Sequence, residues 1–297
     1  MRVFEDTTEF NLNNTVVTLG KFDAIHLGHQ SLLEKAREEK KINGCDTVVF
    51  SFDTSGRNGQ KIIHTKNERI SICKKFGMDY VIFYPVNSET MSMSPEEFVD
   101  KILINKLGAK SVVTGNDFCF GKHRKGNVDT LKTYEKKGSF NVIVSEDVIV
   151  SGEKVSTTRI KECLCKGDIL RVNEMLGFPY SIEGDVLEGK QLGRTIGMKT
   201  VNIIPPDEKC MPLKGVYKSK VIVDGERFKS ITNVGVNPTV KDDGKLVVET
   251  HIFDFDDEIY GKRVKVELEK FIREERNFPD LESLKRQISL DISEANL

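Results

Sequence analysis

Two histidines three residues apart, His26 and His29, stand in a glycine-containing segment that could bind a nucleotide triphosphate. The segment, residues 20–29, follows an apolar run that predicts a buried strand, residues 15–19, and it leads into a helical pattern. Glycines at such a turn let the backbone approach a ligand, and a helix N-terminus offers free N–H groups to phosphate. Because residues three apart share a helix face, both imidazoles can reach one anion. Paired histidines at a turn are more often structural, so the interpretation needs support from other segments.

Two later segments place polar side chains where a nucleotide site would need them. Residues 115–121 follow a predicted strand, so Asp117 and Phe118 stand at its carboxyl end, where α/β sheets bind ligands. Residues 156–161 put hydroxyl and basic groups at a predicted helix start, a typical place for phosphate. The candidates there are Thr157, Arg159 and Lys161. Taken alone, the second segment is more simply an N-cap.

The second half of the chain carries another set of polar candidates. A glycine-bracketed loop begins at Gly193 and brings Thr200 and Asn202 to the start of a strand-like run. It is neither a P-loop nor part of a protein-kinase signature set, and its composition alone indicates a turn. Glu249 shares one face of a later run with aromatic side chains. A carboxylate on a face turned towards a barrel interior or its mouth favours a function.

Length and composition are those of a globular protein of one large domain or two ordinary ones, with 297 residues, 38% hydrophobic and 31% charged. The net charge of −1 gives no bulk attraction to nucleic acid or to an anionic membrane. Residues 1–6 lack the apolar core of a signal peptide, and no run of about 20 apolar residues predicts a membrane span. The six cysteines form no Cys-x-x-Cys pair, which favours reduced thiols and a cytoplasmic protein. Nothing in the sequence indicates self-association.

The first half alternates between β-branched apolar runs and helical patterns. This alternation predicts an α/β, Rossmann-like domain with a parallel sheet, whose first strand carries the two-histidine loop. Ser94, Pro95 and Glu97 form the capping pattern of one of its helices. The predicted strands cover residues 15–19, 47–52, 80–84, 111–114 and 141–144, and the predicted helices cover residues 28–41, 66–76, 95–107 and 127–138.

From about residue 181 the alternation gives way to short strand-like runs separated by turn signals such as Asp224-Gly225. Their even spacing predicts a small antiparallel β-barrel, closed by a helix near residues 280–290. The boundary near residue 180 divides the chain into predicted domains 1–180 and 181–297. The predicted strands of the second domain cover residues 180–187, 216–223, 228–236, 246–253 and 264–271.

Three segments of the first half resemble, in order and spacing, the FMN adenylyltransferase domain of bacterial bifunctional riboflavin kinase/FAD synthetases. Residues 20–29 read Gly-x-Phe-Asp-x-x-His-x-Gly-His, which also resembles the signature of the HxGH nucleotidylyltransferase superfamily. Residues 115–121 read Gly-x-Asp-Phe-x-Phe-Gly, and residues 156–161 end in Thr-x-Ile-Lys. The resemblance covers roughly residues 10–180. It implies a domain that joins FMN to ATP and releases FAD and pyrophosphate.

The resemblance also implies roles for individual residues. His26 and His29 would hold the triphosphate while the FMN phosphate attacks the α-phosphorus directly, without a covalent enzyme intermediate. Lys161 and Thr157 would neutralise the leaving pyrophosphate, and Asp117 would help to place ATP or FMN. Further nucleotide contacts are implied for Gly20, Phe22, Asp23, Gly28 and Arg159, and a flavin contact for Phe118.

The chain departs from the family in two places. Residues 52–56 read Phe-Asp-Thr-Ser-Gly where the family carries Phe-x-Pro-His-Pro, which predicts a reshaped pocket wall. Lys161 stands where the family has arginine, and lysine keeps the charge but loses the bidentate fork. Both changes bear on the rate of adenylyl transfer or the flavin fit and leave the fold untouched.

Five separated segments of the second half resemble, in order, the riboflavin kinase domain of the same bifunctional enzymes. Lys199 replaces the proline of the family's first segment, which predicts a looser loop because proline fixes φ. The remaining matches are Gly-Val-Tyr, Asn-Val-Gly-x-x-Pro-Thr, Glu-x-His-x-x-Asp-Phe and Phe-x-Arg-x-Glu-x-x-Phe. They start at residues 215, 233, 249 and 271, and the resemblance covers roughly residues 181–291.

By this second resemblance, Thr200 and Asn202 would bind Mg²⁺ together with the ATP phosphates, since magnesium prefers hard oxygen ligands. Gly193 would contact the nucleotide. Glu249 would be the general base for the terminal ribityl hydroxyl of riboflavin. Arg273 would contact flavin or phosphate, or would equally well form a surface salt bridge.

The leading interpretation is a bifunctional enzyme that converts riboflavin to FMN and FMN to FAD. Riboflavin, FMN, FAD and ATP are then its small-molecule partners, with Mg²⁺ as cofactor. One alternative keeps the kinase and gives the first domain a weakened or altered-substrate activity, because Pro-His-Pro is missing. Another is a non-catalytic flavin-binding regulator, which the predicted base and metal ligands disfavour because binding alone needs neither.

Overall fold

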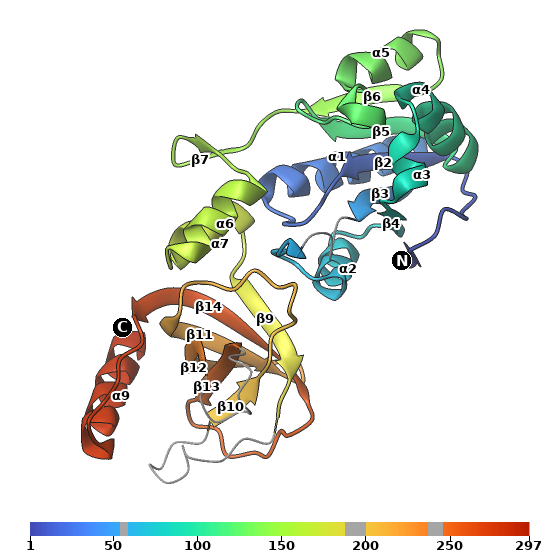
Figure 1. Cartoon of the computed structure of the whole chain (residues 1–297). Coiled ribbons are helices and arrows are strands. Elements are labelled where there is room, and N and C mark those ends of the chain that lie inside the picture. Colours follow the sequence, from blue (N-terminus) through green and yellow to red (C-terminus); the bar gives the residue numbers. More distant parts are fainter. Residues whose placement is uncertain (54–58, 188–199, 237–245, 297) are drawn as a thin grey trace. The chain divides into compact units, whose positions relative to one another are not determined.

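The computed structural model describes residues 1–53, 59–187, 200–236 and 246–296 and shows two compact units, Met1–Thr157 and Thr158–Leu297 (Figure 1). The sequence predicts a domain boundary later in the chain, near residue 180. The helices between residues 157 and 180 therefore belong to the first predicted domain but to the second compact unit. Those helices are α6 (Thr157–Cys165) and α7 (Ile169–Leu176). Within the described residues, no helix is long and apolar enough to cross a membrane.

The first unit is built on a parallel sheet. Its strands are β1 (Arg2–Glu5), β2 (Thr15–Gly20), β3 (Asp46–Asp53), β4 (Tyr80–Pro85), β5 (Ala109–Gly115) and β6 (Asn141–Ser145). They lie in the order β1-β4-β3-β2-β5-β6, so the predicted parallel sheet is confirmed. β2 is buried along its whole length, as expected of a strand covered on both faces. The sequence missed β1, because a strand of four residues with exposed ends gives no clear apolar pattern.

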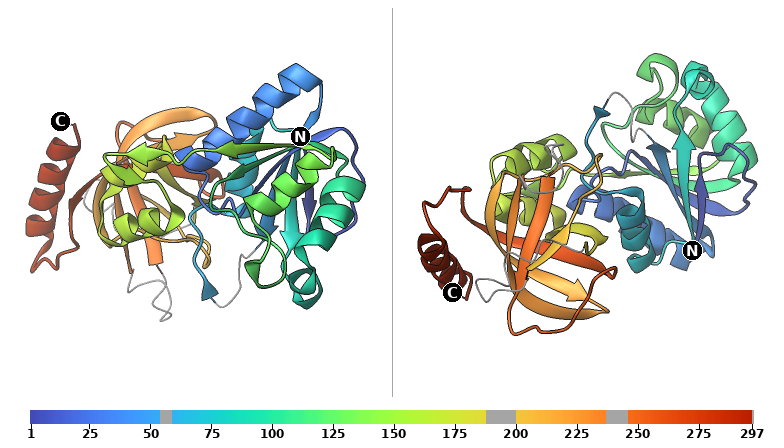
Figure 2. Two further views of the ribbon diagram at one scale, coloured as in Figure 1. Left: turned by 90° about the horizontal axis from the view of Figure 1, so that it is seen from above. Right: turned by 60° about the horizontal axis from the view of Figure 1, so that its bottom comes forward.

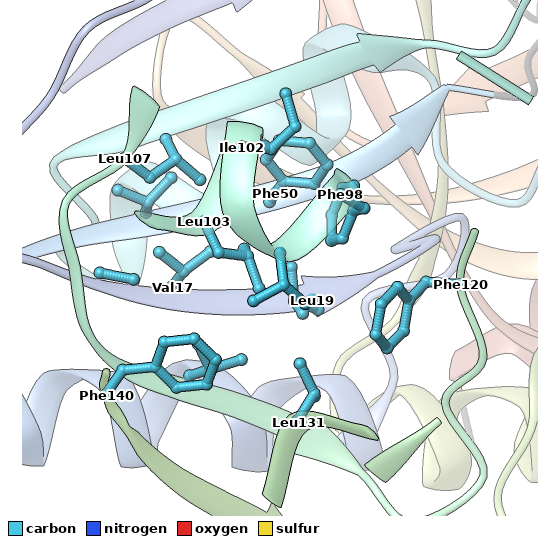
Figure 3. Packing of buried hydrophobic residues seen from close by; sticks show 14 of the residues in the cluster. Val17, Leu19, Phe50, Phe98, Ile102, Leu103, Leu107, Phe120, Leu131 and Phe140 are labelled. Atoms are coloured by element: carbon cyan, nitrogen blue, oxygen red, sulfur yellow. The ribbon is translucent and has the colours of Figure 1, made fainter. Parts of the chain in front are cut away.

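Helices cover both faces of this sheet. The main ones are α1 (Leu27–Asn43), α2 (Lys66–Lys75), the π-helix η2 (Phe98–Lys106) and α5 (Val128–Lys136). Leu33 of α1 and Cys73 of α2 belong to one hydrophobic cluster. Leu103 of η2 and Leu131 of α5 belong to a second cluster, which also contains Phe50 of β3 (Figure 3). The smaller elements are α3 (Ser88–Ser92), α4 (Pro95–Glu97), η3 (Lys122–Arg124), β7 (Ile149–Val150) and β8 (Glu153–Lys154).

One helix differs from its sequence pattern. It begins where the capping pattern places it, because Ser94 and Glu97 close a capping box around Pro95. Beyond Glu97 it continues as the π-helix η2 rather than as the regular α-helix expected up to residue 107. Only its first turn is therefore α-helical.

The strand order reverses between β2 and β5, which are neighbours in the sheet. From β2 the chain runs through α1 to β3, and from β5 it runs through α5 to β6 on the other side. Ligands of open α/β sheets bind outside the carboxyl ends of the strands at such a reversal. The two loops that leave these ends are the ones that carry residues 20–29 and 115–121.

The second unit is an antiparallel sheet followed by one helix. Its elements are β9 (Tyr180–Asp185), β10 (Thr200–Ile203), β11 (Gly215–Val223), β12 (Glu226–Val236), β13 (Leu246–Ile252), β14 (Arg263–Arg273) and α9 (Leu281–Asn296). The strand order is β10-β13-β12-β11-β14-β9, and the sheet curls into the predicted barrel (Figure 2). Leu187, just beyond β9, pairs with Asn202 of β10 and so links the two edge strands. The predicted closing helix is confirmed as α9, which packs against β11, β12 and β14.

Candidate active sites

The two histidines of the first unit lie together at the N-terminus of α1. His26 is the N-cap residue, and its Nδ1 accepts a hydrogen bond from the backbone N–H of His29 at 3.3 Å. His29 Nδ1 donates to the carbonyl of Ala24. The rings are stacked, with centroids 4.0 Å apart and planes 17° apart. In their neutral forms, His26 therefore carries its proton on Nε2, whereas His29 Nε2 is an acceptor.

Small residues make room for these rings. A Cβ on Gly28 would lie 3.1 Å from His26 Cε1, and a Cβ on Gly20 would lie 3.0 Å from the ring of Phe22. Phe22 has a φ of 47°, a left-handed conformation that is uncommon for a bulky residue. Its ring lies 4.9 Å from that of His29. The glycines and this strained residue thus hold the imidazoles in place.

Burial keeps both histidines neutral in the ligand-free protein. Loss of solvation, helped by the neighbouring His29, lowers the pKa of His26 from 6.5 to about 2. The pKa of His29 is also lowered, mainly by burial, although Asp23 and Asp117 oppose this. A bound triphosphate would favour the protonated forms, because an anion close to an imidazole raises its pKa.

These pKa values predict a pH-dependent stability. The unfolded chain binds a proton at His26 below pH 6.5, whereas the folded chain does so only near pH 2. The contribution of neutral His26 to the free energy of unfolding is therefore fully present above pH 6.5. It decreases by about 1.4 kcal/mol per pH unit as the pH falls towards 2. His26→Asn keeps a capping oxygen for the His29 N–H and removes this titration. As the pH is lowered from 7 to 5, the melting temperature of the ligand-free variant should rise relative to that of wild type. A difference in melting temperature that stays constant over this range would contradict the prediction.

The segment before α2 holds the histidine loop in place. The backbone N–H of Ile63 donates to Asp23 Oδ1 at 2.7 Å, and that of His64 donates to the Asp23 carbonyl at 3.1 Å. In return, His64 Nδ1 accepts from the backbone N–H of Ile25 at 3.1 Å. Asp23, a predicted nucleotide contact, thus fixes the loop backbone. His64 was not among the residues predicted from the sequence, where its only signal is that histidine is scarce in this chain.

Asp117 leaves the carboxyl end of β5 and forms an ion pair that the sequence did not reveal. Lys154 Nζ lies 2.9 Å from Asp117 Oδ2 and 2.9 Å from Asp147 Oδ1. These two hydrogen bonds raise the pKa of Lys154. Lys154 also contributes to the lowered pKa of His26, so its charge reaches the histidine pair. In the sequence, the only sign of this contact is that Lys154 lies two residues before residues 156–161, the hydroxyl-rich segment of a predicted helix start.

Phe118, the predicted flavin contact, stands in a row of aromatic rings beside the same loop. Its ring is stacked against Phe52 at 6.3 Å and against Phe120 at 5.8 Å. Phe118 is only partly buried, whereas Phe120 belongs to the hydrophobic core. An aromatic side chain with this placement can stack on a planar ring system.

Asp53 directly precedes the residues that depart from the family pattern, and it pairs with two basic side chains of α2. Lys66 Nζ lies 2.8 Å from Asp53 Oδ2, and Arg69 Nη2 lies 3.9 Å from Asp53 Oδ1. Burial lowers the pKa of Arg69, whose guanidinium also rests on the ring of Phe83 at 4.7 Å. The next residues of this segment, 54–56, lie outside the described residues.

Asp53→Asn should destabilise the protein by about 3 kcal/mol, because it removes the counter-charge that forms an ion pair with buried Arg69. This is the low end of the usual range, since Lys66 is partly exposed. Asp6→Asn is the matched control: Asp6 contacts the same Lys66 at 3.5 Å but is 74% exposed. Chemical denaturation should show a loss for Asp53→Asn and almost none for Asp6→Asn. Equal losses of stability in the two variants would mean that burial of the Asp53–Arg69 pair does not contribute to the free energy of unfolding.

The third predicted phosphate-binding segment is divided between the units. Thr157 is the last residue of the first unit and the first of α6. Arg159 and Lys161 lie on α6 in the second unit. The expected helix start at this segment is present. An approach of these side chains to the histidines stays a prediction.

In the second unit, β10 and β13 bring together three of the predicted kinase residues. Asn202 is the direct cross-strand partner of Glu249, and Thr200 lies two residues away on the same face. Thr200 Oγ1 donates to Glu249 Oε1 at 2.8 Å. Thr250 points to the opposite face, where its hydroxyl meets that of Thr232 at 2.9 Å. Gly193 and Lys199 lie outside the described residues.

Arg273 is held by the closing helix. Its Nε and Nη2 donate to the carboxylate of Asp291 at 2.8 to 3.1 Å, and its Nη1 donates to the carbonyl of Glu274 at 3.0 Å. Asp291 is buried, so this is an inner pair that ties α9 to β14 rather than the surface salt bridge of the sequence analysis. A flavin or phosphate at Arg273 would have to compete with Asp291.

Comparisons with known proteins cover both units. Residues 8–159 match the family described as FAD synthetase, and residues 176–297 match the family described as riboflavin kinase. A bifunctional riboflavin kinase/FMN adenylyltransferase of Pseudomonas fluorescens is 34% identical over 94% of this chain and 91% of the relative. The Bacillus subtilis protein of the same description is 32% identical over 95% and 91%. A crystal structure described as a macrolide-efflux protein from Streptococcus pneumoniae covers 99% of this chain and 98% of its own, with a TM-score of 0.89 and 29% identity.

The two family matches follow the order of the two sets of candidate residues, and the resemblance found in the sequence is confirmed. The chain phosphorylates riboflavin to FMN and adenylylates FMN to FAD, and both reactions use ATP. It belongs to the family of bifunctional riboflavin kinase/FMN adenylyltransferases.

Proposed function

We propose that the two reactions take place at separate centres, adenylyl transfer at His26 and His29 and phosphoryl transfer at Glu249. The observation that carries this assignment is that the imidazoles stack at the reversal point of a parallel sheet, while Glu249 receives a hydrogen bond from Thr200 in the second unit. The first arrangement suits binding of a polyphosphate, and the second suits removal of a proton from a hydroxyl.

At the kinase centre, Glu249 is the general base for the terminal ribityl hydroxyl. Thr200 occupies Oε1 of this carboxylate, which leaves Oε2 to accept the substrate proton. The hydroxyl oxygen bonds to the γ-phosphorus of ATP as the bond to the β-phosphate oxygen breaks and ADP leaves. Glu249 takes the proton late in this transfer, when the oxygen has become acidic.

The oxygen atoms beside Glu249 fit a magnesium ion. Asn202 Oδ1 is buried and has no hydrogen-bond partner among the described residues. Thr200 Oγ1 keeps its lone pairs when its proton is donated to Glu249. Both are hard oxygen ligands of the kind that Mg²⁺ prefers, and waters and ATP phosphates would supply its other ligands. Held there, Mg²⁺ would neutralise charge on the transferred phosphoryl group.

At the adenylyltransferase centre, a phosphate oxygen of FMN attacks the α-phosphorus of ATP, and pyrophosphate leaves with the electrons of the broken P–O bond. The enzyme positions the two phosphates and stabilises the developing negative charge. His26 can donate from Nε2 while neutral, whereas His29 becomes a second donor once the bound anion has protonated it. Thr157, Arg159 and Lys161 are the proposed further phosphate contacts, with Asp117 orienting a substrate and Phe118 meeting the flavin.

Product analysis tests whether both centres work. The purified protein is incubated with riboflavin, ATP and Mg²⁺, and separately with FMN in place of riboflavin, and the flavins are separated by chromatography. FAD is expected from both incubations. FMN that accumulates from riboflavin, with nothing formed from supplied FMN, would support the alternative of a weakened first domain. A failure to consume riboflavin would contradict the kinase assignment.

A further inference from the structure

A second amide stands beside Glu249 and is not used in the mechanism above. Asn233 of β12 is the direct cross-strand partner of Glu249 on one side, as Asn202 of β10 is on the other. Directly paired residues point to the same face of a sheet, with Cβ atoms about 5 Å apart. Glu249 is therefore the centre of a row of three polar side chains.

Glu275 fixes which end of the Asn233 amide faces this row. Asn233 Nδ2 donates to Glu275 Oε1 at 3.2 Å, and a carboxylate can only accept, so the amide cannot be the other way round. Glu275 can lie across the strand because residue 235 is glycine: a Cβ on Gly235 would fall 1.8 Å from Glu275 Oε1. Asn233 Oδ1 is thereby turned away from Glu275.

The oxygen that is turned away has no hydrogen-bond donor within the part of the chain that the structure describes. Asn233 Oδ1 is buried, and no described residue gives it a hydrogen bond. Asn202 Oδ1 on the other side of Glu249 is in the same situation. Native proteins rarely leave a buried acceptor unsatisfied, and the exceptions are often places that a ligand completes. A carboxylate between two amide oxygens calls for a group rich in hydrogen-bond donors or for a cation.

We propose that Asn233 Oδ1 accepts a hydrogen bond from the ribityl hydroxyl next to the one that Glu249 deprotonates. The inference rests on the proposed role of Glu249 as the general base. Asn202 and Thr200, both on β10, are the proposed ligands of the cation. Asn233 lies on the opposite side of Glu249 from these two residues, so its oxygen is left for a hydrogen-bond donor. Neighbouring hydroxyls of a polyol chain can then bind Glu249 and Asn233 at once. Asn233 thus positions the chain and selects a vicinal polyol.

Steady-state kinetics of FMN formation test this role. Asn233→Ala should raise the KM for riboflavin about tenfold, which corresponds to about 1.4 kcal/mol for one lost hydrogen bond. The KM for ATP and the rate of FAD formation from FMN should stay unchanged. With the wild-type protein, a riboflavin analogue without the neighbouring hydroxyl should have a KM about tenfold higher than that of riboflavin. With Asn233→Ala, the analogue and riboflavin should have the same KM. If Asn233 were merely structural, its substitution would alter stability or the KM values for both riboflavin and ATP. The KM of the analogue relative to riboflavin would then be raised equally with both proteins.

A charge swap provides the rescue. Asn233→Asp keeps an acceptor but sets a new carboxylate against Glu275 and against Glu249, its direct cross-strand partner, so it should weaken riboflavin binding. Adding Glu275→Gln restores the hydrogen bond in the reverse direction and removes the repulsion at position 275, so it should recover part of the lost riboflavin affinity. An unchanged riboflavin KM in Asn233→Ala, with FMN formation abolished by Glu249→Gln, would overturn this inference alone. FMN formation by Glu249→Gln within about tenfold of wild type would instead overturn the proposed base.

Discussion

Glu249→Gln should abolish FMN formation from riboflavin and leave FAD formation from supplied FMN at the wild-type rate. Glutamine has the shape of glutamate and can still accept the Thr200 hydrogen bond, which is 2.8 Å long in the native protein. It cannot take a proton from the ribityl hydroxyl at neutral pH. The loss should be about a thousandfold, within the range measured for general bases. Initial rates of the two reactions, measured separately by chromatography, provide the comparison.

The control for this variant is another glutamate of the same sheet. Glu226 is exposed at the start of β12, so Glu226→Gln changes the net charge equally and should leave both reactions unchanged. FMN formation by Glu249→Gln within about tenfold of wild type would contradict its role, since a general base contributes at least about a hundredfold.

His29→Ala should have the opposite effect: FMN still forms from riboflavin, and FAD formation from FMN falls by about a hundredfold to a thousandfold. The imidazole stacks on His26 at 4.0 Å and packs beside Phe22 at 4.9 Å, so its loss removes one phosphate donor and loosens the other. The kinase rate, measured in the same sample, shows that the chain is folded and correctly quantified.

An exposed histidine that takes no part in the stacked pair serves as the control for this variant. His123 is exposed and has a φ of 57°, a conformation that asparagine tolerates. His123→Asn should leave both reactions unchanged. If His29→Ala instead reduced both reactions equally in a folded protein, the assignment of two separate centres would be wrong.

Much of the architecture follows from local pattern. The run Thr15–Gly20 is continuously apolar or β-branched, and the structure places it as a buried central strand of a parallel sheet. A helix of the expected length follows it, with His26 as its cap. The grouping of Thr200, Asn202 and Glu249 also agrees with expectation, although the sequence supplied it only through family resemblance.

What the sequence could not show are contacts between residues that are far apart in the chain. The pairing of Asp53 with Arg69 depends on the return of α2 to the end of β3, and that of Arg273 with Asp291 depends on the docking of α9. The orientation of the Asn233 amide likewise needs a glutamate 42 residues away. Residue type and spacing indicate which groups are available for chemistry, whereas the packed structure decides which of them already have a partner.

The most direct test of two independent centres is a mixing experiment with the two inactive variants. Riboflavin, ATP and Mg²⁺ are incubated with Glu249→Gln, with His29→Ala, and with both together, and the flavins are separated by chromatography. Glu249→Gln alone should leave riboflavin unchanged, and His29→Ala alone should stop at FMN. The mixture should form FAD, because FMN released by one variant is adenylylated by the other. A mixture of the two folded variants that makes FMN but no FAD would contradict the account.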